Sequence, residues 1–226
     1  MSKKTIAAGV SRRTVTEVYV GQRVAGDPQA DLHAWEVKGL DPAGPTIIFT
    51  HGWGDSRITS LARLPTLADV NAARARLHGI ALRTPLERSP ELAEASGAMD
   101  VRLKREELQP TGAFKTRGAH NKVGILAEGR PEAALVTASS GNHGIAVATA
   151  AMRHDMRLTV LVGKSVSPAK LERLRALETR RITVELFGND TDDAEAEARR
   201  RDDAGHAIYV PPYNDPDVIA GQATVG

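Results

Sequence analysis

The order of apolar and polar positions divides the chain into two parts. Over the first sixty or so residues, short β-branched and apolar runs predict strands, each closed by glycine, proline or aspartate. These runs are Thr14–Val20, Leu32–Val37 and Pro45–Thr50. The last of them, PTIIFT, is a compact apolar strand of the kind buried in a parallel sheet. We therefore expect this part of the chain to be rich in β structure.

From about residue 64, the spacing of apolar positions is helical. Thr66–Leu77 has apolar residues at helical spacing behind a capping threonine, and Pro90–Ser96 reads as a short helix with proline near its start. Val101–Lys104 predicts a strand and Gly112–Leu126 a helix. Strands and helices then alternate through Ala134–Thr137, Asn142–Arg153, Leu158–Val162, Pro168–Leu177, Ile182–Leu186, Asp192–Asp202 and Ala207–Val210. This alternation is typical of an α/β fold with a parallel sheet.

Composition narrows the class of protein. The 226 residues are 41% hydrophobic and 26% charged, which suits a globular domain with a core. Thirty basic and 28 acidic residues leave a net charge of +2, so we expect no nucleic-acid partner. No apolar run approaches a membrane span, and the start of the chain lacks the apolar region of a secretory signal. The absence of cysteine excludes disulfides and thiolate catalysis. We expect a cytoplasmic enzyme or binding protein without a membrane contact or a metal site.

The first segment with candidate chemistry is Lys104–Ala119, KREELQPTGAFKTRGA. A turn at Gln109–Gly112 delivers Phe114 and Lys115 to the first turn of a helix. The positive end of the helix dipole disfavours a charged lysine there. If the lysine is also partly buried beside an aromatic ring, its pKa falls further and its amine becomes a usable nucleophile. A solvated lysine at a helix start is the plainer alternative.

The second segment is Val136–Ala148, VTASSGNHGIAVA. A short strand ends in the loop Ser139–Gly144, and a helix of small residues follows. Backbone N–H groups of such a loop, at a helix N-terminus, can bind an anion. The plainer alternative is a helix with Ser139 or Ser140 as its N-cap, but capping explains one serine and not the whole run.

Together these segments resemble fold-type II pyridoxal-phosphate (PLP) enzymes, in the branch of threonine/serine dehydratases and serine racemase. Lys104–Ala119 is similar to the lysine motif of that family, and Ser139–Gly144 to its substrate-carboxylate loop. Two further stretches agree, Ser167–Lys170 with Arg175–Leu177, and Pro211–Gln222. The resemblance implies part of a three-layer αβα fold with a parallel sheet, like that of tryptophan synthase β. We expect this domain to span residues 63–226, after an N-terminal segment of residues 1–62.

The resemblance implies a role for each matching residue. Lys115 would form a Schiff base with PLP and move the substrate's α-proton. Phe114 would pack near the cofactor ring, and Asn142 would hydrogen-bond the ring's 3′-oxygen. The substrate carboxylate would be held by Ser139, Ser140, Gly141 and His143. Ser140 would also be a second base opposite the lysine, as in racemase-like members. Ala113 departs from the family, which usually has serine there.

The activity implied is β-elimination and deamination of threonine or serine, a small amino-acid substrate, to a 2-oxo acid and ammonia. A serine or aspartate racemase of the same family is the alternative. An α/β fragment that binds a carboxylate or a partner without turnover, and a hydrolase-derived chimera with no activity, are further alternatives. Exposed apolar sheet edges would favour a homo-oligomer.

Two features do not fit a complete member of this family. The family's glycine-rich phosphate loop is expected downstream of Ala220–Gln222, and the sequence stops at Gly226, so we expect a truncated chain with impaired activity. The stretch Gly44–Ser56, GPTIIFTHGWGDS, instead resembles the strand and oxyanion loop of an α/β-hydrolase, with His51-Gly52 and the N–H of Trp53 at the oxyanion hole. The sequence has no Gly-x-Ser-x-Gly motif, so the resemblance implies a chimera of two partial sequences.

Overall fold

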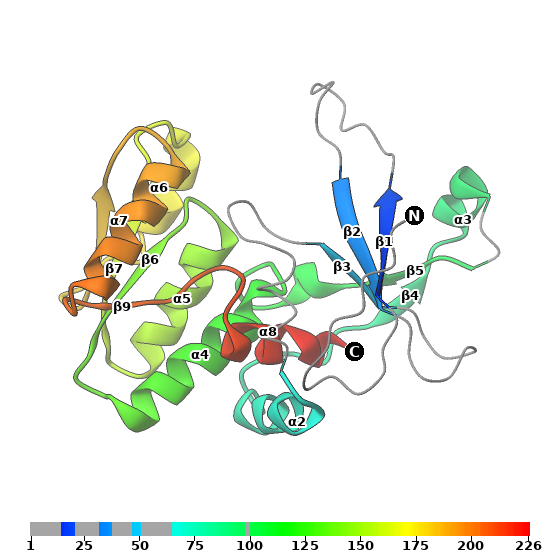
Figure 1. Cartoon of the computed structure of the whole chain (residues 1–226), viewed down its shortest axis with the longest axis horizontal. Helices are drawn as coiled ribbons and strands as arrows, with labels where there is room; N and C mark the ends of the chain where they lie inside the picture. The colour runs from blue at the N-terminus through cyan, green and yellow to red at the C-terminus, as the bar shows by residue number, and fades with distance from the viewer. Residues whose placement is uncertain (1–14, 21–31, 38–46, 51–64, 98–99) are drawn as a thin grey trace. The chain divides into compact units, whose positions relative to one another are not determined.

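The computed structural model describes residues 15–20, 32–37, 47–50, 65–97 and 100–226. The chain divides into two compact units, residues 1–63 and residues 64–226. Each unit is described by itself (Figure 1).

The first unit contains a three-stranded antiparallel sheet of β1 (Val15–Val20), β2 (Leu32–Val37) and β3 (Ile47–Thr50), in that spatial order. The three predicted strands are thus present. The expected parallel pairing of the last strand is wrong, because β3 pairs antiparallel with β2, Ala34 lying opposite Thr50. A short apolar run identifies a strand but not the direction of its neighbour. The candidate oxyanion loop, residues 51–53, lies outside the described residues.

The second unit is an α/β structure with a four-stranded parallel sheet in the order β8-β7-β6-β9. Strands β4 and β5 form a separate antiparallel pair. In chain order the elements are α2 (Leu67–Arg76), β4 (Leu86–Arg88), α3 (Pro90–Ser96), β5 (Arg102–Lys104), η1 (Glu106–Leu108), α4 (Lys115–Gly129), β6 (Ala134–Ala138), α5 (Asn142–Arg153), β7 (Arg157–Val162), α6 (Pro168–Arg175), β8 (Ile182–Leu186), α7 (Thr191–Asp203), β9 (Ile208–Tyr209), α8 (Pro216–Gln222) and η2 (Ala223–Val225).

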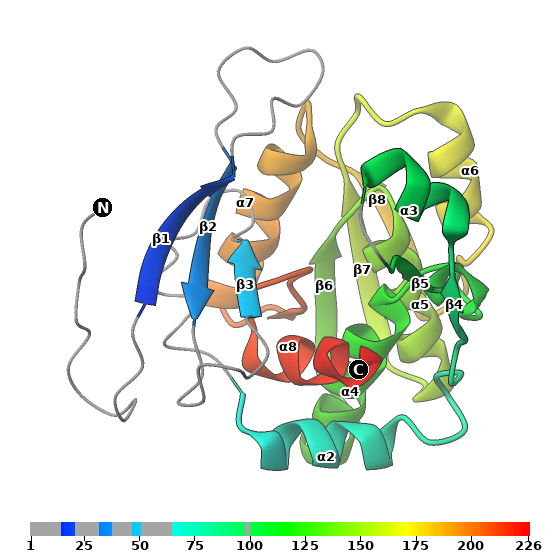
Figure 2. The same cartoon turned by 90° about the vertical axis from the view of Figure 1, so that its right-hand side faces the viewer.

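The strand order accounts for the layers of the second unit. Strands β6, β7 and β8 follow one another outward, so their connecting helices α5 and α6 cover the same face, because crossovers between parallel strands are right-handed. Strand β9 returns to the other side of β6, and its connection, α7, covers the opposite face. Figure 2 shows β6, β7 and β8 running side by side in the same direction. The arrangement is the α/β fold with a parallel sheet that the sequence predicts, with helices on both faces.

Small residues let the helices approach the sheet and one another closely. On one face, Ala146, Val147 and Ala150 of α5 are fully buried in a cluster with Val160 of β7 and Leu174 of α6. Helix α4 joins this cluster through Ala119 and Val123. On the other face, Ala194 and Ala198 of α7 pack with Val136, Leu161 and Tyr209. Each face of the sheet therefore has its own apolar core.

Helix boundaries follow local chemistry. The hydroxyl of Thr66 accepts from the N–H of Asp69 (3.3 Å), and the Asp69 carboxylate accepts from the N–H of Thr66 (2.8 Å), which completes a capping box. Helix α4 begins at Lys115, later than the predicted Gly112, because Gly112 has a φ of 75° and belongs to the preceding turn. Among the described helices, none is both long enough and apolar enough to cross a membrane.

Candidate functional site

The candidate site lies where the strand order of the parallel sheet reverses. The chain leaves β6 toward β7 on one side, whereas β9 lies on the other side of β6. In sheets of this kind, a crevice forms at the carboxyl ends of the two strands that flank the reversal, and ligands bind there. The two segments at these ends are Ser139–Gly141, after β6, and Val210–Asp215, after β9. Both belong to motifs that the sequence singles out.

The loop after β6 leads directly into the first turn of α5. The N-cap is Gly141, and no side chain caps the helix, so the plainer alternative of a serine N-cap is wrong. The hydroxyl of Ser139 instead accepts from the N–H of Gly141 (3.2 Å), which holds this serine within the loop. A Cβ atom on Gly141 would meet nothing within 4 Å. The start of α5 is therefore next to open space and has no capping side chain, as an anion site requires.

Lys115 is the first residue of α4 and is half-buried. Its ammonium donates a hydrogen bond to the carbonyl of Pro212 (2.5 Å), which lies 97 positions further along the chain. The Phe114 ring, 44% exposed, has its centroid 5.4 Å from the same nitrogen. Burial lowers the pKa of Lys115. This lysine is therefore not a solvated residue at a helix start, and it has the environment that an amine nucleophile needs.

His143 is deeply buried, with 3% of its surface exposed. Its Nε2 lies 3.0 Å from the carbonyl oxygen of Val210, which also accepts from the Thr137 hydroxyl at 2.8 Å. Burial lowers the pKa of His143 to about 4; the bond to Val210 opposes this shift and the charge of Lys115 adds to it. The side-chain N–H is thus bound to the protein, and the backbone N–H of His143 is what the loop can offer to a carboxylate.

The remaining predicted residues complete one loop. Ser140 is half-buried, and Asn142 is exposed at the first position of α5. The structure therefore brings Ser139, Ser140, Gly141, Asn142 and His143 together through local sequence. Lys115 and this loop both contact the segment after β9. Lys115 hydrogen-bonds the carbonyl of Pro212, and His143 of the loop hydrogen-bonds the carbonyl of Val210.

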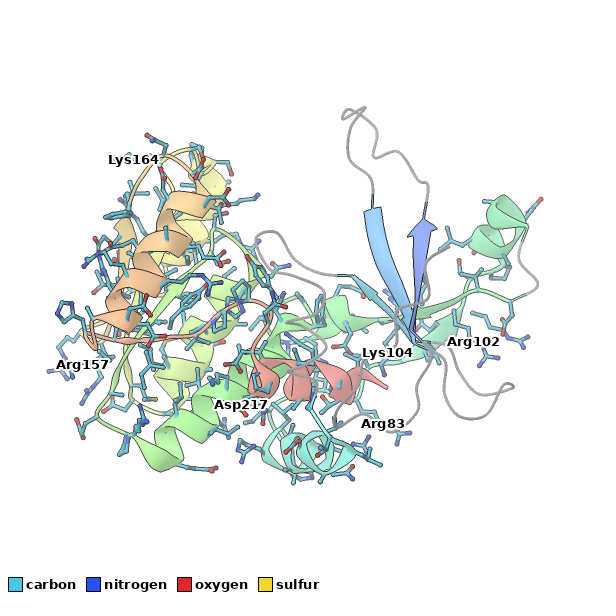
Figure 3. All side chains as sticks on the ribbon, viewed as in Figure 1. Arg83, Arg102, Lys104, Arg157, Lys164 and Asp217 are labelled. Atoms are coloured by element: carbon cyan, nitrogen blue, oxygen red, sulfur yellow. The ribbon has the colours of Figure 1, made fainter. Side chains whose placement is uncertain are left out.

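One face of α4 holds the segment after β9 in place. Asn121 donates to the carbonyl of Asp217 (2.7 Å), and the Lys122 ammonium contacts the carboxylates of Asp215 (2.8 Å) and Asp217 (2.9 Å). Asp217, labelled in Figure 3, lies near the start of α8. Further along, a Cβ on Gly118 would lie 2.7 Å from the carbonyl of Val218, so α4 and α8 cross in close contact.

A buried ion pair anchors the first turn of α4, and the sequence did not predict it. The Arg117 guanidinium makes two 2.8 Å bonds to the carboxylate of Glu106, and both residues are under 10% exposed. Thr84 and Gln109 also donate to this carboxylate. Glu106 and Arg117 flank Lys115 in its motif, and this placement is the signal that could have found them.

Comparisons with known proteins identify relatives of the second unit. A family model described as pyridoxal-phosphate dependent enzyme matches residues 78–226. An L-threonine ammonia-lyase of Thermotoga maritima is 39% identical over 161 residues, which are 71% of this chain and 39% of that protein.

Two solved structures show the same fold. A pyridoxal 5′-phosphate-dependent aspartate racemase matches with a TM-score of 0.64 and 31% identity, over 71% of this chain and 49% of that one. The processed form of threonine deaminase isoform 2 from Solanum lycopersicum matches with a TM-score of 0.62 and 30% identity, over 76% of this chain and 45% of that one. The chain thus spans less than half the length of each of these relatives.

Proposed function

The chain belongs to the family of pyridoxal-phosphate-dependent enzymes, and we propose that it carries the cofactor on Lys115 and deaminates threonine or serine. The observation that carries the proposal is the half-buried amine of Lys115, placed with the Ser139–His143 loop at the reversal of the parallel sheet. The printed name of the Thermotoga maritima relative, an L-threonine ammonia-lyase, supports this substrate class.

The residues present fit the cofactor and an amino-acid substrate. Burial lowers the pKa of Lys115, and this shift favours the free amine, the form that bonds to the cofactor. The start of α5 has no capping side chain and has open space at Gly141, so its N–H groups can receive a carboxylate. When bound, PLP supplies an electron sink for the charge that develops at the substrate's α-carbon.

The chain's own residues would orient the substrate and move protons. The loop Ser139–His143 would bind the carboxylate through backbone N–H groups and the serine hydroxyls. This contact would turn the α-carbon–hydrogen bond toward Lys115, whose free amine would take the proton. Loss of the β-hydroxyl as water, followed by hydrolysis in which a water molecule adds and the amino group leaves as ammonia, would give a 2-oxo acid.

A racemase is the second candidate, and two observations favour it. Ser140 is half-buried in the carboxylate loop, where a hydroxyl could return the α-proton to the opposite face. The solved structure of an aspartate racemase also matches the chain at a TM-score of 0.64. Both reactions begin with loss of the α-proton, so Lys115 would serve either one, and Ser140 would be needed for racemisation alone.

The test supplies PLP and L-threonine or L-serine to the whole chain, and measures 2-oxo acid, ammonia and the D-amino acid. Lys115→Ala is expected to lower the rate by on the order of 10²–10⁴-fold, the usual contribution of a positioned acid–base group. Lys164→Ala is the matched control, since Lys164 is exposed on the loop after β7 (Figure 3). Release of 2-oxo acid at the same rate by both variants would overturn the assignment of Lys115. Formation of the D-amino acid without ammonia would establish the racemase.

The organisation of the chain is part of the same proposal. We place the enzymatic part in residues 63–226, separate from the hydrolase-like residues 1–62, and we expect cleavage near the boundary when the whole chain is exposed to a low dose of protease. We also expect a homo-oligomer in the cytoplasm, which light scattering and cell fractionation would test.

A further inference from the structure

His143 has one ring nitrogen in a hydrogen bond and one without. Nε2 lies 3.0 Å from the carbonyl oxygen of Val210. Nδ1 is buried and finds no hydrogen-bond partner among the residues that the structure describes. A carbonyl oxygen is an acceptor, so Nε2 must carry the proton in this contact. Because Nδ1 has no acceptor among the described residues, the form that fits these contacts is the neutral ring with its proton on Nε2.

A charged ring would be costly at this position. Its second N–H would be buried without an acceptor, and an unsatisfied buried donor is strongly unfavourable. Lys115, whose charge also lowers the pKa of His143, adds repulsion. The ring is therefore fixed in one protonation state and one tautomer by what surrounds it.

The carbonyl of Val210 accepts the hydrogen bond from His143, and further hydrogen bonds hold the backbone of Val210 in place. Its N–H donates to the carbonyl of Val136 on β6 (2.9 Å), and its carbonyl accepts from Thr137 (2.8 Å) as well as from His143. Two positions further on, the carbonyl of Pro212 accepts from Lys115 (2.5 Å). A short segment thus carries both the acceptor for His143 and the acceptor for Lys115.

We propose that His143 is a positioning residue, which ties the first turn of α5 to the Val210–Pro212 segment and thereby fixes the acceptor of the Lys115 amine. Its side chain does not bind the substrate carboxylate. The effect of this contact on catalysis rests on the proposed function. The contact between His143 and Val210 does not, because both of its partners belong to the protein.

The tie explains why a histidine suits this position. Its ring is long enough to reach from α5 to the end of β9. The Val210 carbonyl accepts one hydrogen bond from Thr137, and the single N–H of the neutral ring supplies a second. A glutamine could place an amide N–H near the position of Nε2, whereas a methionine of similar length has no N–H to donate. These two residues therefore make a matched pair for a test.

The experiment uses the whole chain without added cofactor, and follows the reaction of Lys115 with formaldehyde and cyanoborohydride by peptide mass spectrometry. In His143→Met we expect Lys115 to be methylated about fivefold faster than in the wild type, the factor that corresponds to an ordinary hydrogen bond of about 1 kcal/mol. In His143→Gln we expect a rate close to the wild type. His154→Gln, an exposed histidine at the end of the same helix, is the control and should change nothing.

Nitrogen NMR of the histidine rings gives a second readout that does not depend on folding of a variant. We expect His143 to be neutral at neutral pH, with its proton on Nε2. A proton on Nδ1, or an unchanged rate for Lys115 in a folded His143→Met chain, would overturn the proposal. If the chain proves unable to bind PLP but shows the expected rates and tautomer, the proposed function fails and the positioning role of His143 stands.

Discussion

Replacing Glu106 by glutamine is expected to cause a large loss of stability in the second unit. Glu106 is 8% exposed, and its carboxylate accepts two 2.8 Å bonds from Arg117 and one of 2.5 Å from Thr84. Arg117 is 6% exposed and also donates to the carbonyl of Leu82 (2.9 Å). Glutamine keeps the shape of the side chain but leaves the buried guanidinium without a counter-charge.

Two estimates of the magnitude agree. Removing one partner of a buried ion pair typically costs about 3–5 kcal/mol. Independently, burial raises the pKa of Glu106, but the hydrogen bonds and charge of its neighbours, Arg117 above all, outweigh burial and bring the pKa from 4.5 to about 2. A shift of that size corresponds to about 3 kcal/mol of stability at neutral pH.

The assay is urea unfolding at pH 7, followed by far-ultraviolet circular dichroism. Glu107→Gln is the matched control, because this neighbouring carboxylate is exposed and paired with Arg105 at the surface. We expect its midpoint to stay close to that of the wild type. Equal midpoints for the Glu106 and Glu107 variants would show that the buried ion pair does not stabilise the second unit.

The wild-type chain provides a second measurement if Glu106→Gln does not fold. Since the folded pKa of Glu106 lies below its unfolded value, the stability it contributes is present above pH 4.5 and is lost as the pH falls toward 2. Stability that stays constant across that range would contradict the role of the ion pair.

Three further predictions concern the same unit. Gly221→Ala would place a Cβ 2.6 Å from the carbonyl of Arg117 and 2.7 Å from the Cα of Gly118. We expect this variant to lose about 1–3 kcal/mol of stability, measured by urea unfolding. The control is Gly129→Ala, whose added Cβ meets nothing within 4 Å and should cause no loss. Burial lowers the pKa values of His120 and His143 from 6.5 to about 4, so unfolding takes up protons and stability should fall as the pH drops from 6.5 to 4; a flat stability between these values would contradict their burial as neutral rings. Asp190→Ala removes an N-cap that accepts from Asp192 (3.0 Å) and Asp193 (3.1 Å) and should cost about 1 kcal/mol in thermal unfolding, whereas Asp203→Ala, at the opposite end of α7, should not destabilise.

Much of the fold of the second unit could be predicted from local sequence, because local rules decide it. Thr66 caps α2 with a residue three positions away, and α3, α5 and β8 have the predicted bounds. The alternation of strands and helices is enough to predict the parallel sheet, since a helical crossover between two neighbouring strands makes them parallel. The candidate loop Ser139–His143 was found for the same reason, as its residues are contiguous.

The rest depends on contacts between distant residues, which leave little trace in sequence. Charged side chains are by default exposed, so the residue types of Glu106 and Arg117 do not predict a buried pair, and only their position in the motif around Lys115 points to it. The acceptor of Lys115 is a backbone carbonyl, and a backbone carbonyl is present at every residue whatever its type. The antiparallel pairing of β3 depends in the same way on its neighbour β2, not on its own apolar run.

The central claim, that Lys115 carries the cofactor, is tested most directly by adding PLP to the whole chain, reducing with borohydride and sequencing the labelled peptide by mass spectrometry. We predict one modified residue, Lys115, together with a new visible absorbance band that is lost in Lys115→Ala and kept in Lys164→Ala. A folded chain with no label, or with the label on Lys122 or Lys164 in place of Lys115, would contradict it.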